Sequence, residues 1–288
     1  MVFQKLLKRK EFKPIGICRD KAGWKSLLEL GAGKDQVKIA DIRDKSSINS
    51  IFNEHKDEKS KIEKVIMCES ARPRKKFGRK LKDFFKKLLR REVIIRKPSD
   101  MYYKDGESPY QIDYIGAKNV IDVAVESTGS KVDHIVLLGN MGGYSGSKLN
   151  ELGRKKGETD NKVGNLLSWK RATERYLMKR CFFTIVHAGA LTEDPGGRRE
   201  IVWDVDDSLL RANFKRIPKD DVAEVLVQAL IHKELMGAQG KSIDVAAKPE
   251  SNKEKEKEKG STNAKPYRND WVRFWSISGS CTYPGVET

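Results

Sequence analysis

The segment from Val132 to Leu191 constrains the fold more than any other part of the chain, because strand, turn, helix and strand patterns follow one another there. The apolar run HIVLLG ends at Gly139 and leads into Asn140 and a glycine pair. A helical pattern covers 165–180, and a second apolar run, FFTIVHAGAL, follows it. Short apolar strands that alternate with helices are typical of parallel sheets covered on both faces. Such sheets bind ligands at the carboxyl ends of their strands.

The same alternation extends over most of the chain. Strands are predicted over 14–18, 37–40, 65–68, 135–139, 183–187 and 243–246. Helices are predicted over 21–30, 46–52, 112–127, 165–180 and 219–235. This order predicts one α/β domain over 1–247, built on a doubly wound parallel sheet.

The net charge of +17 is concentrated in one segment. Residues 72–97 hold thirteen Lys or Arg against two acidic residues, and apolar residues at helical spacing predict a cationic amphipathic helix over 77–91. One hypothesis is that this basic insert binds nucleic acid or an acidic surface, such as an anionic membrane. The other is a solvated insert, which is favoured because its only aromatic residues are Phe77, Phe84 and Phe85.

The C-terminal part has a different composition. Residues 248–265 form a charged, low-complexity linker with too few apolar groups to pack. Residues 266–288 are predicted to hold a terminal helix capped near Asp270, with Trp271, Phe274 and Trp275 on one face.

Cysteine and histidine positions point to a reducing compartment and to no metal site. The four cysteines, at 18, 68, 181 and 281, have no paired spacing. His134 and His187 border strands, where hydrogen-bonded core histidines are expected rather than catalytic ones. No apolar run approaches the roughly 20 residues that span a bilayer. We expect a cytoplasmic protein, with an organelle such as the plastid as the alternative.

Several of these segments, in order, resemble the atypical short-chain dehydrogenase/reductase family, and most closely its plant-type NAD(P)-binding Rossmann proteins. The resemblance covers roughly 12–250 and includes DGESPYQIDYIGAKNVIDVA, HIVLLGNMGG, LLSWKRATERYL and FTIVHAGALTEDPGGRREI. It implies a Rossmann-like sheet and a dinucleotide partner, with NADP favoured over NAD, together with an unknown small molecule.

The resemblance also assigns cofactor-binding positions. Arg19 stands where the family holds the 2′-phosphate of NADP, and Asp41 and Ile42 match its adenine-binding pair. Cys68, Glu69 and Ser70 match the loop over the adenine ribose. The alternatives are a solvated arginine, an aspartate that caps its own turn, and an ordinary surface loop.

The catalytic positions agree only in part with the family. Lys170 matches the lysine that binds the nicotinamide ribose, and Asn140 stands in place of the family's serine. The tyrosine expected one helical turn before that lysine is Leu166, which cannot transfer a proton. Lys170 as a solvated helix lysine is the alternative. Tyr144 is a weaker candidate for the missing acid.

The largest difference from the family lies at the start of the sequence. Its members open with a strand and a glycine-rich turn that binds the pyrophosphate, whereas no glycine precedes Gly16 here and the chain begins within the following helix. The absent strand would be central, so we expect a gap of roughly 10 Å or strands that pair out of order. An N-terminally incomplete sequence, weak folding and impaired cofactor binding are the corresponding expectations.

The sequence therefore supports one main functional hypothesis. Under this hypothesis, which rests on the family resemblance, the chain is an NAD(P)-binding protein. It is either an NADP-dependent oxidoreductase with altered catalytic residues or a nucleotide-sensing regulator. Binding of nucleic acid or of an acidic surface through 72–97 is the alternative.

Overall fold

The computed structural model describes residues 1–57, 60–75, 101–127, 132–143, 148–154, 162, 164–212, 214–236, 240–248, 270–277 and 279–281. The predicted basic helix over 77–91, nearly all of the linker over 248–265, and Tyr144 lie outside these residues. The structural statements below concern the described residues.

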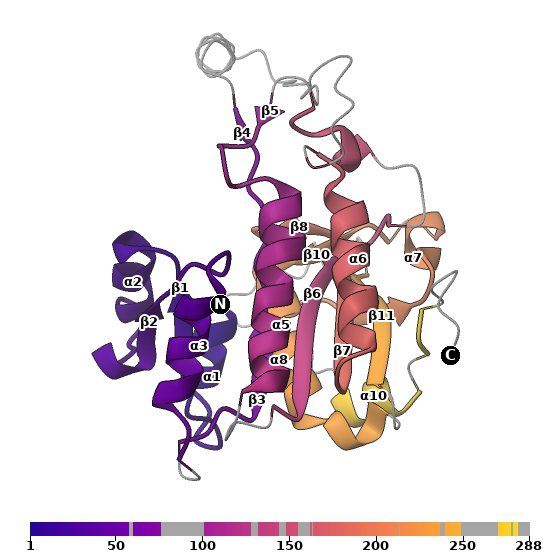
Figure 1. Cartoon of the computed structure of the whole chain (residues 1–288). Coiled ribbons are helices and arrows are strands. Elements are labelled where there is room, and N and C mark those ends of the chain that lie inside the picture. Colours follow the sequence, from indigo (N-terminus) through magenta and orange to yellow (C-terminus); the bar gives the residue numbers. More distant parts are fainter. Residues whose placement is uncertain are drawn as a thin grey trace, which may run out of the picture.

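A five-stranded sheet forms the centre of the molecule (Figure 1). Its strands, in spatial order, are β3 (Lys64–Met67), β6 (His134–Asn140), β7 (Phe183–Ala188), β11 (Gly240–Ala247) and β9 (Ile201–Asp204). Neighbours among the first four are parallel, and β9 pairs with β11 antiparallel. The predicted α/β class and mostly parallel sheet are confirmed.

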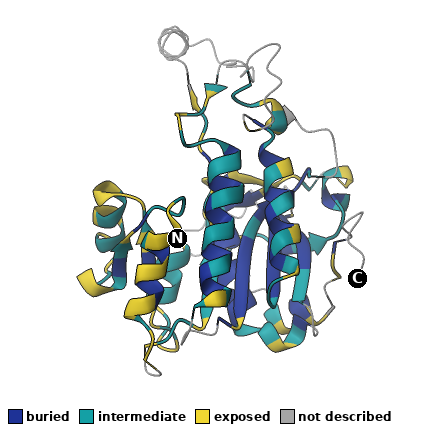
Figure 2. Ribbon diagram, in the orientation of Figure 1, coloured by how far each residue is buried: buried dark blue, intermediate teal, exposed yellow. Residues whose placement is uncertain are grey.

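Helices cover both faces of this sheet, which explains why its strands are apolar throughout. Along β6, Ile135 and Leu137 enter one core cluster and Val136 enters the other, as the two-residue period of a strand requires. The first cluster packs under α3 (Lys45–Glu54), α5 (Ala117–Glu126) and α6 (Leu166–Met178). The second packs against α1 (Val2–Leu7), α8 (Lys219–Ile231) and α10 (Trp271–Ile277). Figure 2 shows the buried residues concentrated on the sheet and on the inner sides of the helices.

The two N-terminal strands form a separate small sheet. β1 (Gly16–Cys18) pairs in parallel with β2 (Val37–Ile39), and α2 (Lys21–Leu28) connects them. Among the described strands, β1 bonds only to β2, and β3 bonds only to β6. The predicted interruption of the sheet is therefore confirmed, and the alternative of strands pairing out of order does not occur.

Helix α1 lies against the main body through charge as well as apolar contact. Lys5 Nζ lies 3.0 Å from Asp220 and 3.2 Å from Glu224, and Arg9 pairs with Glu224 at 2.6 Å. Both acidic residues belong to α8, so these ion pairs join the first helix to a helix more than 200 positions later in the sequence.

The predicted helix over 112–127 and the predicted terminal helix both form, with local differences. The first begins as a π-helical segment, η3 (Tyr110–Gly116), and continues as α5. The second is α10, where Asp270 accepts a hydrogen bond from the Arg273 backbone amide at 3.0 Å as expected of an N-cap. The remaining short elements are η1 (Lys34–Gln36), β4 (Arg74–Lys75), β5 (Met101–Tyr102), η4 (Lys148–Glu151), β8 (Ala190–Thr192), α7 (Ser208–Arg211), β10 (Arg216–Pro218) and η5 (Lys233–Met236).

Both strand histidines are fully buried and hydrogen-bonded, as the sequence predicts. His134 Nε2 lies 2.9 Å from Thr184 Oγ1, and His187 Nδ1 lies 2.9 Å from Asp244 Oδ1. No helix within the described parts of the chain has both the length and the apolar character needed to cross a bilayer.

Burial of His134 predicts a loss of stability in mild acid. Burial lowers the pKa of His134 to about 3, below its unfolded value of about 6.5. The folded state therefore binds fewer protons, and its stability is complete above pH 6.5 and falls as the pH drops towards 3. Between pH 7 and pH 5, this residue costs about 2 kcal/mol of unfolding free energy. Urea unfolding of the wild type and of His134→Gln at pH 7 and pH 5 measures this effect. On going from pH 7 to pH 5, the wild type should lose about 2 kcal/mol more unfolding free energy than the variant. Identical pH dependences in the two proteins would contradict it.

Candidate dinucleotide site

The predicted cofactor residues lie where strands end. Arg19 follows β1, Asp41 and Ile42 follow β2, and the 68–70 loop follows β3. Asn140 is the last residue of β6. Because β1 is parallel to β2, and β3, β6 and β7 are parallel to one another, the carboxyl ends of the strands within each of these two groups share one edge, which is the edge at which open α/β sheets bind ligands.

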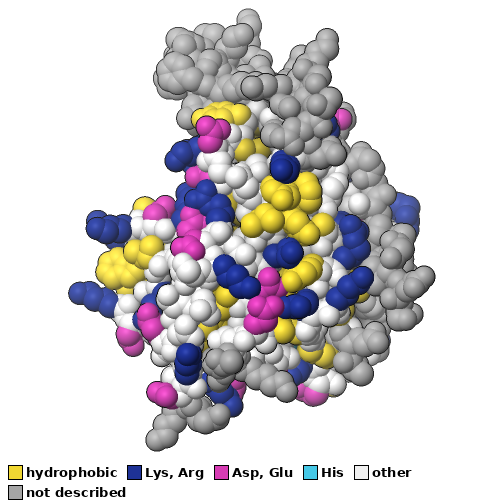
Figure 3. Space-filling view, viewed as in Figure 1, with side chains coloured by type: hydrophobic (Ala, Val, Ile, Leu, Met, Phe, Trp, Pro, Cys, Tyr) yellow, Lys and Arg dark blue, Asp and Glu magenta, His cyan; other side chains and the backbone are white. Residues whose placement is uncertain are grey.

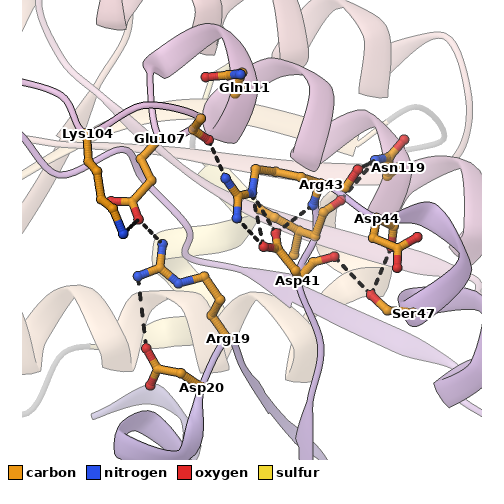
Figure 4. Close-up of polar contacts among 12 residues, drawn as sticks. Arg19, Asp20, Asp41, Arg43, Asp44, Ser47, Lys104, Glu107, Gln111 and Asn119 are labelled. Atoms are coloured by element: carbon orange, nitrogen blue, oxygen red, sulfur yellow. Dashed lines mark hydrogen bonds and ion pairs between the residues drawn. The ribbon is translucent and has the colours of Figure 1, made fainter.

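Arg19 belongs to a group of charged residues around Glu107 (Figure 4). Its Nη1 lies 2.9 Å from Glu107 Oε1, and Arg74 approaches the other carboxylate oxygen at 3.0 Å. The Arg19 side chain is 45 % exposed, whereas that of Glu107 is only 12 % exposed. Arg19 is thus a half-exposed guanidinium held by a nearly buried carboxylate.

Asp41 and Arg43 form the neighbouring group. Arg43 Nε lies 2.9 and 3.0 Å from the two oxygens of Asp41, and the Arg43 backbone amide donates to Asp41 Oδ1 at 3.0 Å. These hydrogen bonds lower the pKa of Asp41 and keep it ionised. The same Arg43 donates through Nη1 to the Gly106 carbonyl at 2.6 Å. Asp41 therefore caps its own turn, as the alternative interpretation expects, while its partner Arg43 contacts the same 104–107 loop as Arg19.

Ile42 and the loop after β3 make fewer polar contacts. Ile42 is half-buried and packs against the first core cluster, close to Gly116. The Ile42 carbonyl accepts from Asn119 Nδ2 at 2.9 Å. Cys68 and Ser70 are exposed at the strand end.

Lys170 is buried within the core. Its Nζ lies 2.9 Å from Asp113 Oδ1 and 3.4 Å from the Glu69 carbonyl. Burial alone would lower the pKa of Lys170, but the adjacent Asp113 carboxylate outweighs it and the net pKa is raised. The interpretation of Lys170 as a solvated helix lysine is therefore wrong, because the side chain is only 9 % exposed.

The space beside Lys170 is small. A cavity of about 10 Å³ is lined by Glu69, Asp113, Leu137, Leu138, Lys170, Thr173 and Glu174. Such a volume accommodates about one water molecule. Arg19 and Asp41 do not line it, so the structure places the predicted residues in two separate groups.

The remaining catalytic position makes a structural contact. The Asn140 backbone carbonyl accepts a hydrogen bond from Arg171 Nη2 at 3.1 Å. Leu166, at the position of the family's tyrosine, is buried at the start of α6.

Sequence reasoning missed three residues of these groups, namely Arg43, Glu107 and Asp113. A signal existed for Asp113, since it lies between Ile112 and Ile115 on a helix that is otherwise apolar on its inner face. Arg43 lies two positions after Asp41, within reach of a turn-capping carboxylate. Little in the local sequence indicates Glu107, because Arg19 and Arg74 lie 88 and 33 positions away and the nearby Lys104 approaches it only at 4.0 Å.

Comparisons with known proteins agree with this architecture. The NAD(P)H-binding family model matches residues 1–233. The chain is 34 % identical over 258 residues to an uncharacterised chloroplastic protein of Arabidopsis thaliana, and this match covers 87 % of the chain and 66 % of that relative. It is also 34 % identical over 261 residues to the sanguinarine reductase of Eschscholzia californica, covering 87 % and 85 % of the two chains.

A solved structure shares the fold at much lower sequence similarity. A putative NAD-dependent epimerase/dehydratase from Bacillus halodurans is 17 % identical, with a TM-score of 0.53 and coverage of 86 % and 88 %. Together with the family match, this identifies the class as NAD(P)-binding Rossmann-fold proteins. The chain belongs to the NAD(P)H-binding family and is of the atypical short-chain dehydrogenase/reductase type.

The ion pair between Lys170 and Asp113 gives a stability prediction. Removing one partner leaves a buried charge without its counter-ion, so Lys170→Met and Asp113→Asn should each lower the unfolding free energy by about 3 to 5 kcal/mol. The double variant should lose less than the sum of the two. Urea unfolding of all four proteins measures this coupling.

The exposed pair between Lys45 and Glu126 provides the control. These side chains are 47 % and 51 % exposed and lie 3.2 Å apart. Lys45→Met should cost less than about 1 kcal/mol. Additive losses at Lys170 and Asp113 would show that the two charges do not stabilise each other.

Proposed function

We propose that this chain binds NADP through the adenosine end of the dinucleotide, with Arg19 and Arg43 holding the 2′-phosphate. The supporting observation is that two guanidinium groups, at the ends of neighbouring strands, both contact the 104–107 loop (Figure 4). Planar guanidinium groups match phosphate oxygens in pairs. A 2′-phosphate would take over the contacts that Glu107 and the Gly106 carbonyl now make.

The two ends of the dinucleotide fit the chain unequally. The adenosine end meets half-exposed arginines and an ionised Asp41 that suit a phosphate and a polar ring. The position expected for the nicotinamide end holds Lys170 in an ion pair beside a cavity of about 10 Å³. A bound dinucleotide would supply hydride chemistry. The role of Arg19 and Arg43 would be to position its 2′-phosphate.

Figure 3 shows acidic and basic side chains interleaved over the described part of the face that it draws. The basic insert, apart from its first residues, lies outside the described part of the chain. The family match and the strand-end arginines therefore support the dinucleotide hypothesis over the nucleic-acid alternative.

Replacing Arg19 should reduce NADPH affinity selectively. A charge-assisted phosphate contact contributes about 1.5 to 3 kcal/mol, so Arg19→Ala should weaken NADPH binding about 10- to 100-fold. NADH affinity should not change, since NADH lacks the 2′-phosphate. Titration followed by nicotinamide fluorescence measures the dissociation constants of NADPH and NADH. The matched control is Arg211→Ala, which removes an exposed arginine of α7. Equal losses for NADPH and NADH would exclude the assigned contact.

A change at Glu107 tests the same site in the opposite direction. Glu107→Gln removes the negative charge that competes for Arg19 and should strengthen NADPH binding. If Arg19→Ala and Glu107→Gln both leave the ratio of NADPH to NADH affinity unchanged, these residues do not contribute to binding of the 2′-phosphate.

A reductase with altered catalytic residues is the second candidate. It is supported by the relative named sanguinarine reductase, to which the chain is 34 % identical over 261 residues. Leu166 cannot donate the proton that the usual tyrosine supplies, so a different acid would be required. Lys170 would also have to leave Asp113 to reach a bound cofactor.

Hydride transfer can be measured directly with saturating NADPH and sanguinarine. If the chain is a reductase, NADPH should be consumed in proportion to sanguinarine added, and Lys170→Met should lower kcat at least 100-fold. NADPH binding without consumption would contradict the reductase and leave the nucleotide-sensing role. Because one relative is named chloroplastic, a plastid is proposed beside the cytoplasm as a compartment for that role.

A further inference from the structure

Three side chains with metal-binding atoms converge in the main sheet, next to Glu174, which also lines the cavity beside Lys170. His187 lies on β7, and Asp244 is its direct register partner on β11. Cys281 comes from the segment after α10. His187 and Asp244 are fully buried and Cys281 is 6 % exposed. Sequence spacing gave no indication of this cluster, because its members are 57 and 37 positions apart.

The backbone holds the C-terminal segment in place. The Cys281 amide donates to the Ser242 carbonyl at 2.6 Å, and the Ser242 amide donates to Ser280 Oγ at 3.1 Å. Ser242 lies in β11, just before the residues 244–247 that pair with β9. These two hydrogen bonds tie the segment to β11 at Ser242, and the Cys281 thiol lies near the two buried residues.

The spacing of the three atoms fits a small tetrahedral cation. His187 Nδ1 lies 2.9 Å from Asp244 Oδ1, and Cys281 Sγ lies 3.6 Å and 3.7 Å from these two atoms. Tetrahedral zinc, with bonds of about 2.0 to 2.3 Å, separates its ligand atoms by about 3.3 to 3.6 Å. The two distances to sulfur already match, and the distance between nitrogen and oxygen would have to open by about 0.4 Å.

The atoms behind the cluster orient its members. His187 Nε2 lies 3.2 Å from Glu174 Oε2 and 2.5 Å from Arg171 Nη1, so a ring that binds a metal through Nδ1 and carries its proton on Nε2 would donate to Glu174 and would require the Arg171 guanidinium to move away. The Asp207 amide donates to Asp244 Oδ2 at 2.7 Å, which leaves Oδ1 facing the thiol. Such outer contacts fix the orientation of histidine and carboxylate ligands in metal sites.

We propose that His187, Asp244 and Cys281 form a site for Zn²⁺, in which the metal fastens the C-terminal segment to β7 and β11. Imidazole, carboxylate and thiolate are all ligands of this ion. The three residues leave a fourth tetrahedral position for water. Metal binding would then stabilise the contact between the end of the chain and the central sheet, because the ligands come together only in the folded state.

Cobalt substitution of the full chain tests the proposal. After dialysis against a chelator, Co²⁺ should bind at one equivalent and give the near-ultraviolet absorption of a cobalt–thiolate bond. Zn²⁺ should displace it and raise Tm. Cys281→Ser should abolish the absorption and weaken binding at least 10-fold, whereas Cys181→Ser and Cys68→Ser, which change a half-buried and an exposed thiol, should leave both unchanged.

Asp244→Asn provides a second, independent variant. It keeps the shape of the side chain and should weaken Co²⁺ binding while retaining the thiolate absorption at high metal concentration. Near-ultraviolet circular dichroism confirms that each variant is folded. Absence of a cobalt–thiolate band in the wild type, or the same band in Cys281→Ser, would overturn the proposal.

Discussion

Burial of β6, β7 and β11 on both faces is the constraint on which the rest of the structure depends. Alternate residues of β6 enter opposite core clusters, so helices must cover both sides of the sheet. Each covering helix must then return the chain to the same end of the sheet, which makes neighbouring strands parallel. The strand ends, and the polar residues after them, consequently gather along one edge. Asn140 and the 68–70 loop lie on this edge because of that topology, whereas Arg19, Asp41 and Arg43 follow the strands of the separate β1–β2 sheet.

Polar groups inside this apolar framework are stabilised by pairing, and this pairing determines what they can do. Lys170 remains charged in the core because Asp113 lies beside it, and the same contact keeps its ammonium group from a ligand. Asp113 is available because η3 turns it inward, where it also accepts from the Ala71 amide. In this arrangement, the lysine that the family resemblance assigns to the nicotinamide ribose is held in an ion pair. Its release would require another partner for Asp113.

Most of the central fold could be predicted from the sequence, because buried strands and amphipathic helices leave local patterns. The strands β6 and β7 and the helix α6 lie within two residues of their predicted bounds. The short strands β8, β9 and β10 were missed, since three or four residues are too few to show a period. The site was harder to predict. Glu107, Asp113 and Cys281 meet their partners only through tertiary packing, so motif spacing does not reveal them.

The separation of the two sheets explains why the proposed dinucleotide site is divided. Arg19 and Arg43 belong to the β1–β2 unit, whereas Lys170 lies on α6, which covers the main sheet, and no described strand joins β1 to β3. The two parts are held together instead by packing of α3 against α5 and by Asn119, which donates to the carbonyls of Ile42 and Arg43 at 2.9 and 3.1 Å. These contacts hold one side of the β1–β2 unit, but no described strand fills the interval between β1 and β3. A dinucleotide that reached from one group to the other would have to cross this interval, so its adenosine end can be held firmly while its nicotinamide end is not.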